Sequence, residues 1–211
     1  MPKAKFLFWI DLETSGTDEH ADPILEAAWI ITTRMHPFDE LSHGSLVVEP
    51  DKNQWPMWRS RMDPFVLKMH SSNGLLDDID QSTWHSSRGV TITDLQEAIV
   101  SHLSLHGNKG EYLIAGSGVS HFDRQMIKAQ MPLVNEWLQY PSFDVGVLRR
   151  CLESLYYGNQ FVGEAYGANI IATSGTAHRA QDDIRDHLNE WRIYSAFFQN
   201  ALNGIYEGIE V

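Results

Sequence analysis

The chain has 211 residues, of which 43% are hydrophobic and 21% are charged, a composition typical of a soluble globular protein. Its formal net charge is -12, from 28 acidic and 16 basic residues, which excludes a broad basic face for a long nucleic-acid duplex. A short anionic ligand or a metal ion is compatible with this charge. The length, and a sequence without repeats, predict a single domain over residues 1–211.

Cys151 is the only cysteine, which rules out an intrachain disulfide and favours a reducing, cytoplasmic compartment. Its position in the helical stretch VLRRCLESLYY predicts buried packing rather than thiol chemistry. The apolar run before Asp11 has only five residues, too few for the core of a signal peptide, and no apolar run is long enough to span a membrane.

Three apolar runs predict strands in the first part of the chain, at residues 6–10, 24–32 and 44–50. The first two are almost continuously apolar, which is typical of strands covered on both faces. The next segment, DKNQWPMWRSRMDP (51–64), contains two prolines and has no clear period, which predicts irregular structure.

Helices are expected to alternate with strands from residue 93 onward. The segment 93–106 has apolar residues at helical spacing and a capping pattern formed by Thr93 and Gln96. A short strand is predicted at 112–116, followed by a Gly/Ser loop and a helix that begins near Asp123.

The last part of the chain repeats this pattern and ends in a long helix. PSFDVGVLRRCLESLYY predicts a strand and then a helix with Asp144 as its N-cap, and a glycine-containing connection follows at 162–176. The final helix is expected at about 176–200. Its apolar stripe has a period of 3.6 and contains Ala180, Ile184, His187, Trp191, Tyr194 and Phe198. These elements predict a mixed α/β sheet with helices packed on it.

Two carboxylates, Asp11 and Glu13, follow the first apolar run in the stretch FWIDLETSG. Successive side chains of a strand alternate between faces, so both project to the same side, at roughly 6 to 7 Å backbone separation. Carboxylates placed in this way repel each other, or one of them takes up a proton. A divalent cation would remove the conflict, since Mg²⁺ and Mn²⁺ prefer oxygen ligands. The alternative is a pair of solvated charges beyond the end of the strand.

Asp123 follows a predicted strand at the start of a helix, where α/β proteins commonly bind ligands. Ser120 and Asp123 also match a helix-capping pattern, which would explain both residues without a ligand.

The stretch TAHRAQDDIRD supplies His178, Asp182 and Asp183 at the head of the last helix. At about 100° per residue, Asp183 borders the apolar stripe whereas Asp182 points away from it. Asp183 is therefore the inward-facing candidate. His178 can act with it only from a position at or before the first turn, and by itself it could equally be a surface residue.

Together these residues resemble the DEDDh 3′-to-5′ exonucleases, which have a ribonuclease-H-like fold. Within that superfamily the chain is most similar to oligoribonuclease, over residues 8–198. The matching stretches, in order, are FWIDLETSG, ILEAAWIIT, MHSSNGLL, SFDVGVL and AHRAQDDIRDHLNEWRIY.

This resemblance implies that Asp11, Glu13, Asp123 and Asp183 hold two divalent metal ions, Mg²⁺ or Mn²⁺, and that His178 is the general base. Histidine suits that role because its unperturbed pKa lies near 6.5. The resemblance also implies a homodimer and a substrate of short single-stranded RNA bound by its 3′ end. The substrate-binding residues that it implies are Leu12, Thr14, Gly16, His70, Ser71 and Tyr140.

The sequence departs from the family at three positions that bear on substrate length. The bulky apolar residue that wedges against terminal bases is replaced by Thr17. An Arg and a Ser that grip the 5′ phosphate correspond to Pro141 and Gly146. The stretch GSGVSHFD is one residue longer than its counterpart, and HFD is closer to proofreading exonucleases of DNA polymerases.

Three functions therefore compete. The first is a metal-dependent exonuclease acting on short single-stranded RNA, and the second is a proofreading-type DNA exonuclease. The third is a nucleotide-binding relative without turnover, which the presence of His178 disfavours because a binding protein needs no general base.

Overall fold

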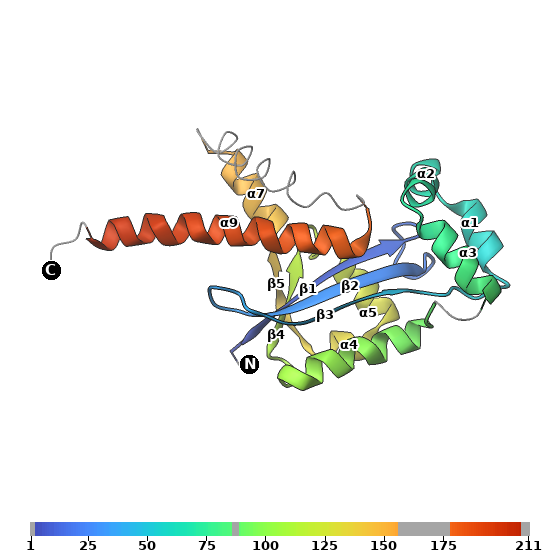
Figure 1. Ribbon diagram of the computed structural model, residues 1–211, viewed down its shortest axis with the longest axis horizontal. Helices are drawn as coiled ribbons and strands as arrows, with labels where there is room; N and C mark the ends of the chain where they lie inside the picture. Colours follow the sequence, from blue (N-terminus) through green and yellow to red (C-terminus); the bar gives the residue numbers. More distant parts are fainter. Residues whose placement is uncertain (1–2, 86–88, 156–177, 208–211) are drawn as a thin grey trace.

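The computed structural model describes residues 3–85, 89–155 and 178–207 (Figure 1). Within these ranges one five-stranded sheet has the order β3-β2-β1-β4-β5. β2 pairs antiparallel with both β1 and β3, whereas β4 runs parallel to β1 and β5 runs parallel to β4. The strands are β1 (Phe6–Thr14), β2 (Ile24–Thr33), β3 (Glu40–Val47), β4 (Tyr112–Gly116) and β5 (Leu138–Asp144).

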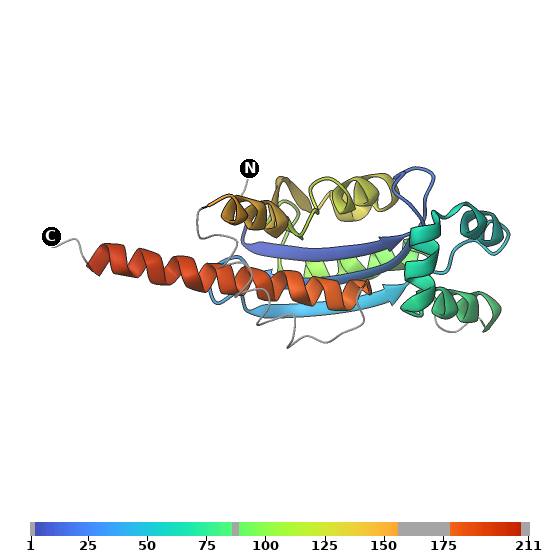
Figure 2. The ribbon, with the colours of Figure 1, turned by 90° about the horizontal axis from the view of Figure 1, so that it is seen from above.

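Helices cover both faces of this sheet, which confirms the predicted mixed α/β architecture. α4 and α5 pack on one face and α7 and α9 on the other, and α1 to α3 gather beyond the end toward which β1 runs (Figures 1 and 2). α9 continues well past the sheet. The helices are α1 (Trp55–Arg61), α2 (Pro64–Ser72), α3 (Leu75–His85), α4 (Ile92–His106), α5 (Asp123–Gln130), α6 (Pro132–Asn135), α7 (Val145–Glu153) and α9 (Ala180–Glu207).

Strand β1 lies at the centre of the sheet and contributes side chains to two separate hydrophobic cores. Phe8, Ile10 and Leu12 face the core shared with α4 and α5, whereas Leu7 and Trp9 face the core shared with α7 and α9. This alternation follows from the two-residue period of a strand. It explains why the run reads as continuously apolar, as the sequence predicted for a strand covered on both faces.

Two sequence predictions in the first part of the chain are wrong. The third strand spans Glu40–Val47 rather than 44–50, because its hydrogen-bonded pairing with β2 covers that range. Gly44 of this strand lies directly beneath the Trp29 ring. The segment 51–64 is largely helical. Its prolines occupy first-turn positions of α1 and α2, where proline is tolerated because the N–H it lacks would have no helical partner.

The cap of α4 and the burial of Cys151 also differ from expectation. Thr91 and Asp94 form the capping box, two residues before the predicted pair. Cys151 is exposed, because the next residue, Leu152, points into the core and Cys151 lies one helical step away from it. Asp144 caps α7 as predicted, accepting a hydrogen bond from the Val147 N–H at 3.1 Å.

The predicted connection at 162–176 lies outside the described residues, and α9 begins at Ala180. The expected stripe is confirmed in large part. Ala180, Ile184 and Tyr194 are buried against the sheet, with Trp191 and Phe198 packed beside them. No described helix combines the length and the hydrophobicity required to cross a membrane.

Candidate active site

Asp11 and Glu13 lie within strand β1, near its C-terminal end, rather than beyond it. They share the face of Leu7 and Trp9, which is the face that α9 covers. Glu13 is only 7% exposed, so the pair is not a set of solvated charges. The strand therefore directs two carboxylates toward the first turn of α9.

Asp183 meets them from that first turn. One carboxylate oxygen from each of Asp11, Glu13 and Asp183 lies within 4.8 Å of the other two. Within the described residues this is the one group of acids, histidines or cysteines close enough to share a metal ion, and Asp182 is not part of it. The helical periodicity therefore correctly predicted that Asp183, rather than Asp182, faces β1.

Asp123 approaches the same strand from the opposite face of the sheet. It is the first residue of α5 and is 5% exposed, and its carboxylate accepts a hydrogen bond from the backbone N–H of Leu12 at 3.0 Å. The helix-capping alternative does not hold, because the Ser120 hydroxyl donates instead to the Asp144 carboxylate at 3.1 Å.

Burial makes these four acids reluctant to ionise in the metal-free protein. It raises the pKa of Glu13 to about 8 and that of Asp123 to about 7. Burial also raises the pKa of Asp11, with repulsion from Asp123 and Glu13 adding to it, and it raises the pKa of Asp183. A divalent cation would stabilise the ionised forms, so the donor set fits such an ion.

His178 precedes α9, which is where the helical periodicity places it if it is to act with Asp183, and its side chain is exposed. Its backbone has a φ of 62°, in the left-handed region that few residues other than glycine adopt. Its N–H donates a hydrogen bond to the Asp183 carboxylate, and its carbonyl accepts one from the Asn73 side chain. These bonds hold the residue at the edge of the carboxylate cluster, open to solvent.

His70 lies behind Glu13 and has no exposed surface. Its Nε2 donates to the Thr14 carbonyl at 3.0 Å, and its Nδ1 is 3.9 Å from Glu13 Oε2. Burial lowers the pKa of His70. In the described structure it therefore supports the end of β1.

The other residues that the resemblance assigns to substrate have varied positions. The Leu12 side chain lies in the core on the opposite face, so only its backbone borders the acids. Thr14 is buried and donates its hydroxyl to the Gly16 carbonyl at 2.6 Å. A Cβ at Gly16 would lie 2.3 Å from the Asp22 carboxylate, so any larger residue here would displace the Asp22 side chain.

Within the described residues, no hydrogen bond or ion pair joins Ser71 or Tyr140 to the four acids. The Ser71 hydroxyl donates to the Leu67 carbonyl of its own helix, at 2.7 Å. Tyr140 is 87% exposed on the edge strand β5. It lines a cavity of about 470 Å³ together with Ser120, Arg124, Gln125, Lys128, Asn135, Pro141 and Ser142.

Glu26 and Arg179 border the site but were not singled out from the sequence. Glu26 is the direct cross-strand partner of Glu13 and is 3% exposed, and its carboxylate is paired with the Arg179 guanidinium at 2.8 Å. A charged residue inside the apolar run 24–32 was the available signal, because a buried charge needs a partner.

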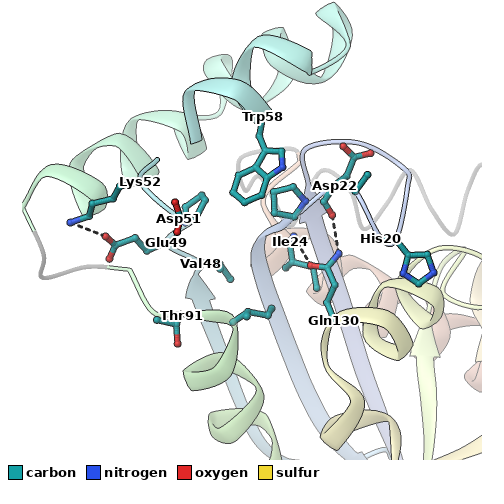
Figure 3. Close-up of a pocket in the computed structure, with 14 residues that line it drawn as sticks. His20, Asp22, Ile24, Val48, Glu49, Asp51, Lys52, Trp58, Thr91 and Gln130 are labelled. Carbon is teal, nitrogen blue, oxygen red and sulfur yellow. Dashed lines mark hydrogen bonds and ion pairs between the residues drawn. The ribbon is translucent and has the colours of Figure 1, made fainter. Parts of the chain in front are cut away.

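A second cavity, of about 650 Å³, contains none of the predicted site residues (Figure 3). Trp58 and the start of β2 border it, and Gln130 donates a hydrogen bond to the Asp22 carbonyl at 2.9 Å. Its charged lining is mainly acidic, with Asp22, Glu49 and Asp51 against Lys52, which does not suit a polyanion.

Comparison with known proteins assigns the chain to a family. No protein-family model matches it. An oligoribonuclease from Corynebacterium diphtheriae is 31% identical over 199 residues, which cover 92% of this chain and 83% of that protein. The chain belongs to the oligoribonuclease family. An oligoribonuclease from Dichelobacter nodosus is 28% identical and covers 92% of this chain and 95% of its own length.

Solved structures agree on the fold. Exonuclease I from Methylocaldum szegediense has a TM-score of 0.65 at 19% identity, and the zinc-bound complex of E. coli exonuclease I with single-stranded DNA has 0.63 at 14%. These matches cover 96% and 97% of this chain but 43% of each exonuclease I chain. The sheet and its helices are thus those of the ribonuclease-H-like exonucleases, and as an oligoribonuclease the chain is a 3′-to-5′ exoribonuclease.

Proposed function

We propose that this oligoribonuclease hydrolyses short single-stranded RNA from the 3′ end with two divalent metal ions, Mg²⁺ or Mn²⁺, held by four acids. Those acids are Asp11, Glu13, Asp123 and Asp183. The observation that carries the proposal is the convergence of three carboxylates within 4.8 Å, with Asp123 hydrogen-bonded to the backbone between two of them. The metal charge also lets a protein of net charge -12 bind an anionic strand end.

His178 and Asp183 have distinct roles in the proposed mechanism. When bound, two divalent ions polarise the scissile phosphate, lower the pKa of the attacking water and neutralise charge on the leaving oxygen. His178 accepts the proton of that water as general base. Asp183 both belongs to the donor set and accepts the His178 backbone N–H, so it fixes the base relative to the acids.

The substrate strand has a suitable surface beside Asp123. The cavity lined by Arg124, Lys128 and Tyr140 contains two cations and no carboxylate. Cations that follow the phosphates and an exposed aromatic ring that stacks on a base are the usual features of single-strand binding. Phe65 on α2 is a second exposed aromatic, at 70% exposure.

Gly146 gives a physical basis for an altered phosphate grip. A Cβ at this position would lie 2.7 Å from the Ser117 hydroxyl, 3.2 Å from Asp144 Oδ1 and 3.4 Å from Arg150 Nη1. The side chains of Ser117 and Arg150 therefore crowd the place where the family carries serine. We propose that they supply the 5′-phosphate contacts that Pro141 and Gly146 cannot make, which would retain the preference for short substrates.

A proofreading-type DNA exonuclease is the alternative, and the loss of the usual gripping residues at Pro141 and Gly146 favours it. Initial rates on 5′-labelled RNA and DNA ladders of two to about twenty-four nucleotides, with Mn²⁺ present and Asp11→Ala as control, separate the two functions. We expect rates to peak at two to four ribonucleotides. Equal rates at all lengths, or a preference for DNA, would reject the short-RNA assignment.

The remaining expectations concern assembly and location. We propose that the chain folds as one domain and forms a homodimer, by analogy with other oligoribonucleases. The single cysteine is compatible with a reducing, cytoplasmic environment. Light scattering of the purified protein tests the dimer.

A further inference from the structure

Arg179, the residue that follows His178, joins two distant parts of the chain to the start of α9. Its guanidinium donates to both oxygens of Glu26 on β2, with distances of 2.8 to 3.2 Å, and lies 3.0 Å from the Asp78 carboxylate on α3. The Ala180 N–H donates to the same Glu26 carboxylate, at 3.1 Å. One buried acid thus holds both an arginine side chain and the first peptide of α9.

Asn73 completes this arrangement from the end of α2. Its side-chain amide donates to the His178 carbonyl, and its own carbonyl accepts from Arg179 Nη1 at 3.4 Å. The Asn73 Oδ1 is occupied separately, by the Leu75 N–H at 3.0 Å. The peptide of His178 is therefore fixed on both sides, by Asn73 at the carbonyl and by Asp183 at the N–H.

A strained backbone at His178 requires such support. A non-glycine residue with a φ of 62° is held there only when its surroundings impose the conformation. His178 itself is exposed, so burial cannot supply that constraint. The buried Glu26 carboxylate can, because an unpaired charge at this depth would be costly and Arg179 is bound to neutralise it.

We propose that Glu26, acting through Arg179, and Asn73, acting on the His178 carbonyl, are positioning residues that hold the general base over the carboxylate cluster. The proposal rests on the role of His178 stated above. Glu26 reaches this position because it is the cross-strand partner of Glu13 on β1, so its pair with Arg179 ties the start of α9 to the strand that carries the acids.

A double-mutant cycle between Glu26→Gln and His178→Ala tests whether the effect passes through the base. In the unmodified chain, Glu26→Gln should lower kcat by about 10- to 100-fold with little change in KM, as for the loss of outer contacts to a catalytic group. In the His178→Ala background it should change kcat by less than about twofold, because the group it positions is gone. The same large loss in both backgrounds would overturn the proposal.

Glu190→Gln is the matched control for buried charge. Glu190, on α9, is also 3% exposed and forms a two-bond pair with Arg149 on α7, away from His178. Both variants should lower the melting temperature, but only Glu26→Gln should lower the kcat of the folded protein. An equal effect on kcat would mean that Glu26 acts only through stability, and would overturn the proposal.

Asn73→Asp provides a test that leaves the core intact. Aspartate keeps an oxygen for the Leu75 N–H but has no donor for the His178 carbonyl, so kcat should fall. Ser72→Ala on α2 should be neutral, because the Ser72 hydroxyl donates only to the Met69 carbonyl of its own helix. Unchanged kcat in Asn73→Asp would reject the part assigned to Asn73. A fully active His178→Ala would reject the general base itself, whereas a slow His178→Ala with a harmless Glu26→Gln would reject only the positioning role.

Discussion

The Asp123 carboxylate accepts a hydrogen bond from the Leu12 backbone N–H, at 3.0 Å, across 111 positions of sequence. Leu12 lies between the two carboxylates of β1, so this bond ties the helix α5 to the centre of the acidic cluster. The site is consequently built on a central strand and on the first turns of two helices. These elements pack in the hydrophobic cores on the two faces of the sheet.

Asp183→Asn should abolish cleavage, whereas Asp182→Asn should leave kcat near that of the unmodified chain. Of these two aspartates, only Asp183 has a carboxylate oxygen within 4.8 Å of those of Asp11 and Glu13. We expect Asp183→Asn to lower kcat by more than about 100-fold, above the usual cost of an outer contact. Steady-state rates on a labelled dinucleotide measure both variants. Equal losses would contradict the assignment of Asp183 as the inward-facing residue.

Chelation should remove activity completely, because no residue of the cluster can replace the charge of a divalent ion. We expect activity to vanish in EDTA and to return with Mg²⁺ or Mn²⁺. Calorimetric titration of the chelated protein should give two binding events, with Asp11→Ala as the control. Turnover that survives exhaustive chelation would exclude the two-metal mechanism.

The stability of the metal-free protein should fall as pH rises from about 4 to 8. The pKa of Glu13 is raised from 4.5 to about 8 and that of Asp123 from 3.8 to about 7, so folding favours their protonated forms. This contribution is full below the unfolded pKa values and is lost as pH rises through the folded ones. Thermal melts in EDTA measure it, and Glu13→Gln should flatten the profile.

Divalent ions should reverse this trend in the same melts. Since bound metal favours the ionised carboxylates, Mn²⁺ should raise the melting temperature more at pH 8.5 than at pH 6. A stabilisation by Mn²⁺ that is independent of pH would show that these acids do not form the metal site.

His178→Ala should slow catalysis without weakening substrate binding. Removal of a general base typically costs about 10²- to 10⁴-fold in rate. The oligonucleotide Kd, measured by fluorescence anisotropy with Ca²⁺ in place of Mg²⁺, should stay unchanged because His178 lies at the exposed edge of the site. A variant that turns over normally once substrate is saturating would assign His178 to binding instead.

Arg150→Ala should selectively impair substrates that carry a 5′ phosphate. We expect KM for a 5′-phosphorylated dinucleotide to rise by about tenfold or more, the value of one charge-assisted hydrogen bond, with no change for the 5′-hydroxyl form. Lys128→Ala, which alters the cavity near Tyr140, serves as the comparison. Equal effects of Arg150→Ala on both substrates would remove Arg150 from the phosphate site.

The sequence by itself indicated the fold class and the alternation of strands and helices from α4 onward, and it singled out the four acids that lie around the end of β1. Continuous apolar runs specified the buried strands, and the 3.6-residue period of α9 separated Asp183 from Asp182, because both signals are local. A local signal also led to a wrong prediction. The prolines of 51–64 suggested irregular structure, although at first-turn positions they are compatible with helices.

Only the tertiary structure decided which residues support the site. Glu26 reads as one charge in an apolar strand, and Arg179 and Asn73 read as ordinary helix-end residues. Their connection spans 153 and 105 positions of sequence, and it exists because β2, α2 and α9 meet beside the end of β1. Partners for a buried charge are chosen by packing between elements, and a pattern within one element carries no information about them.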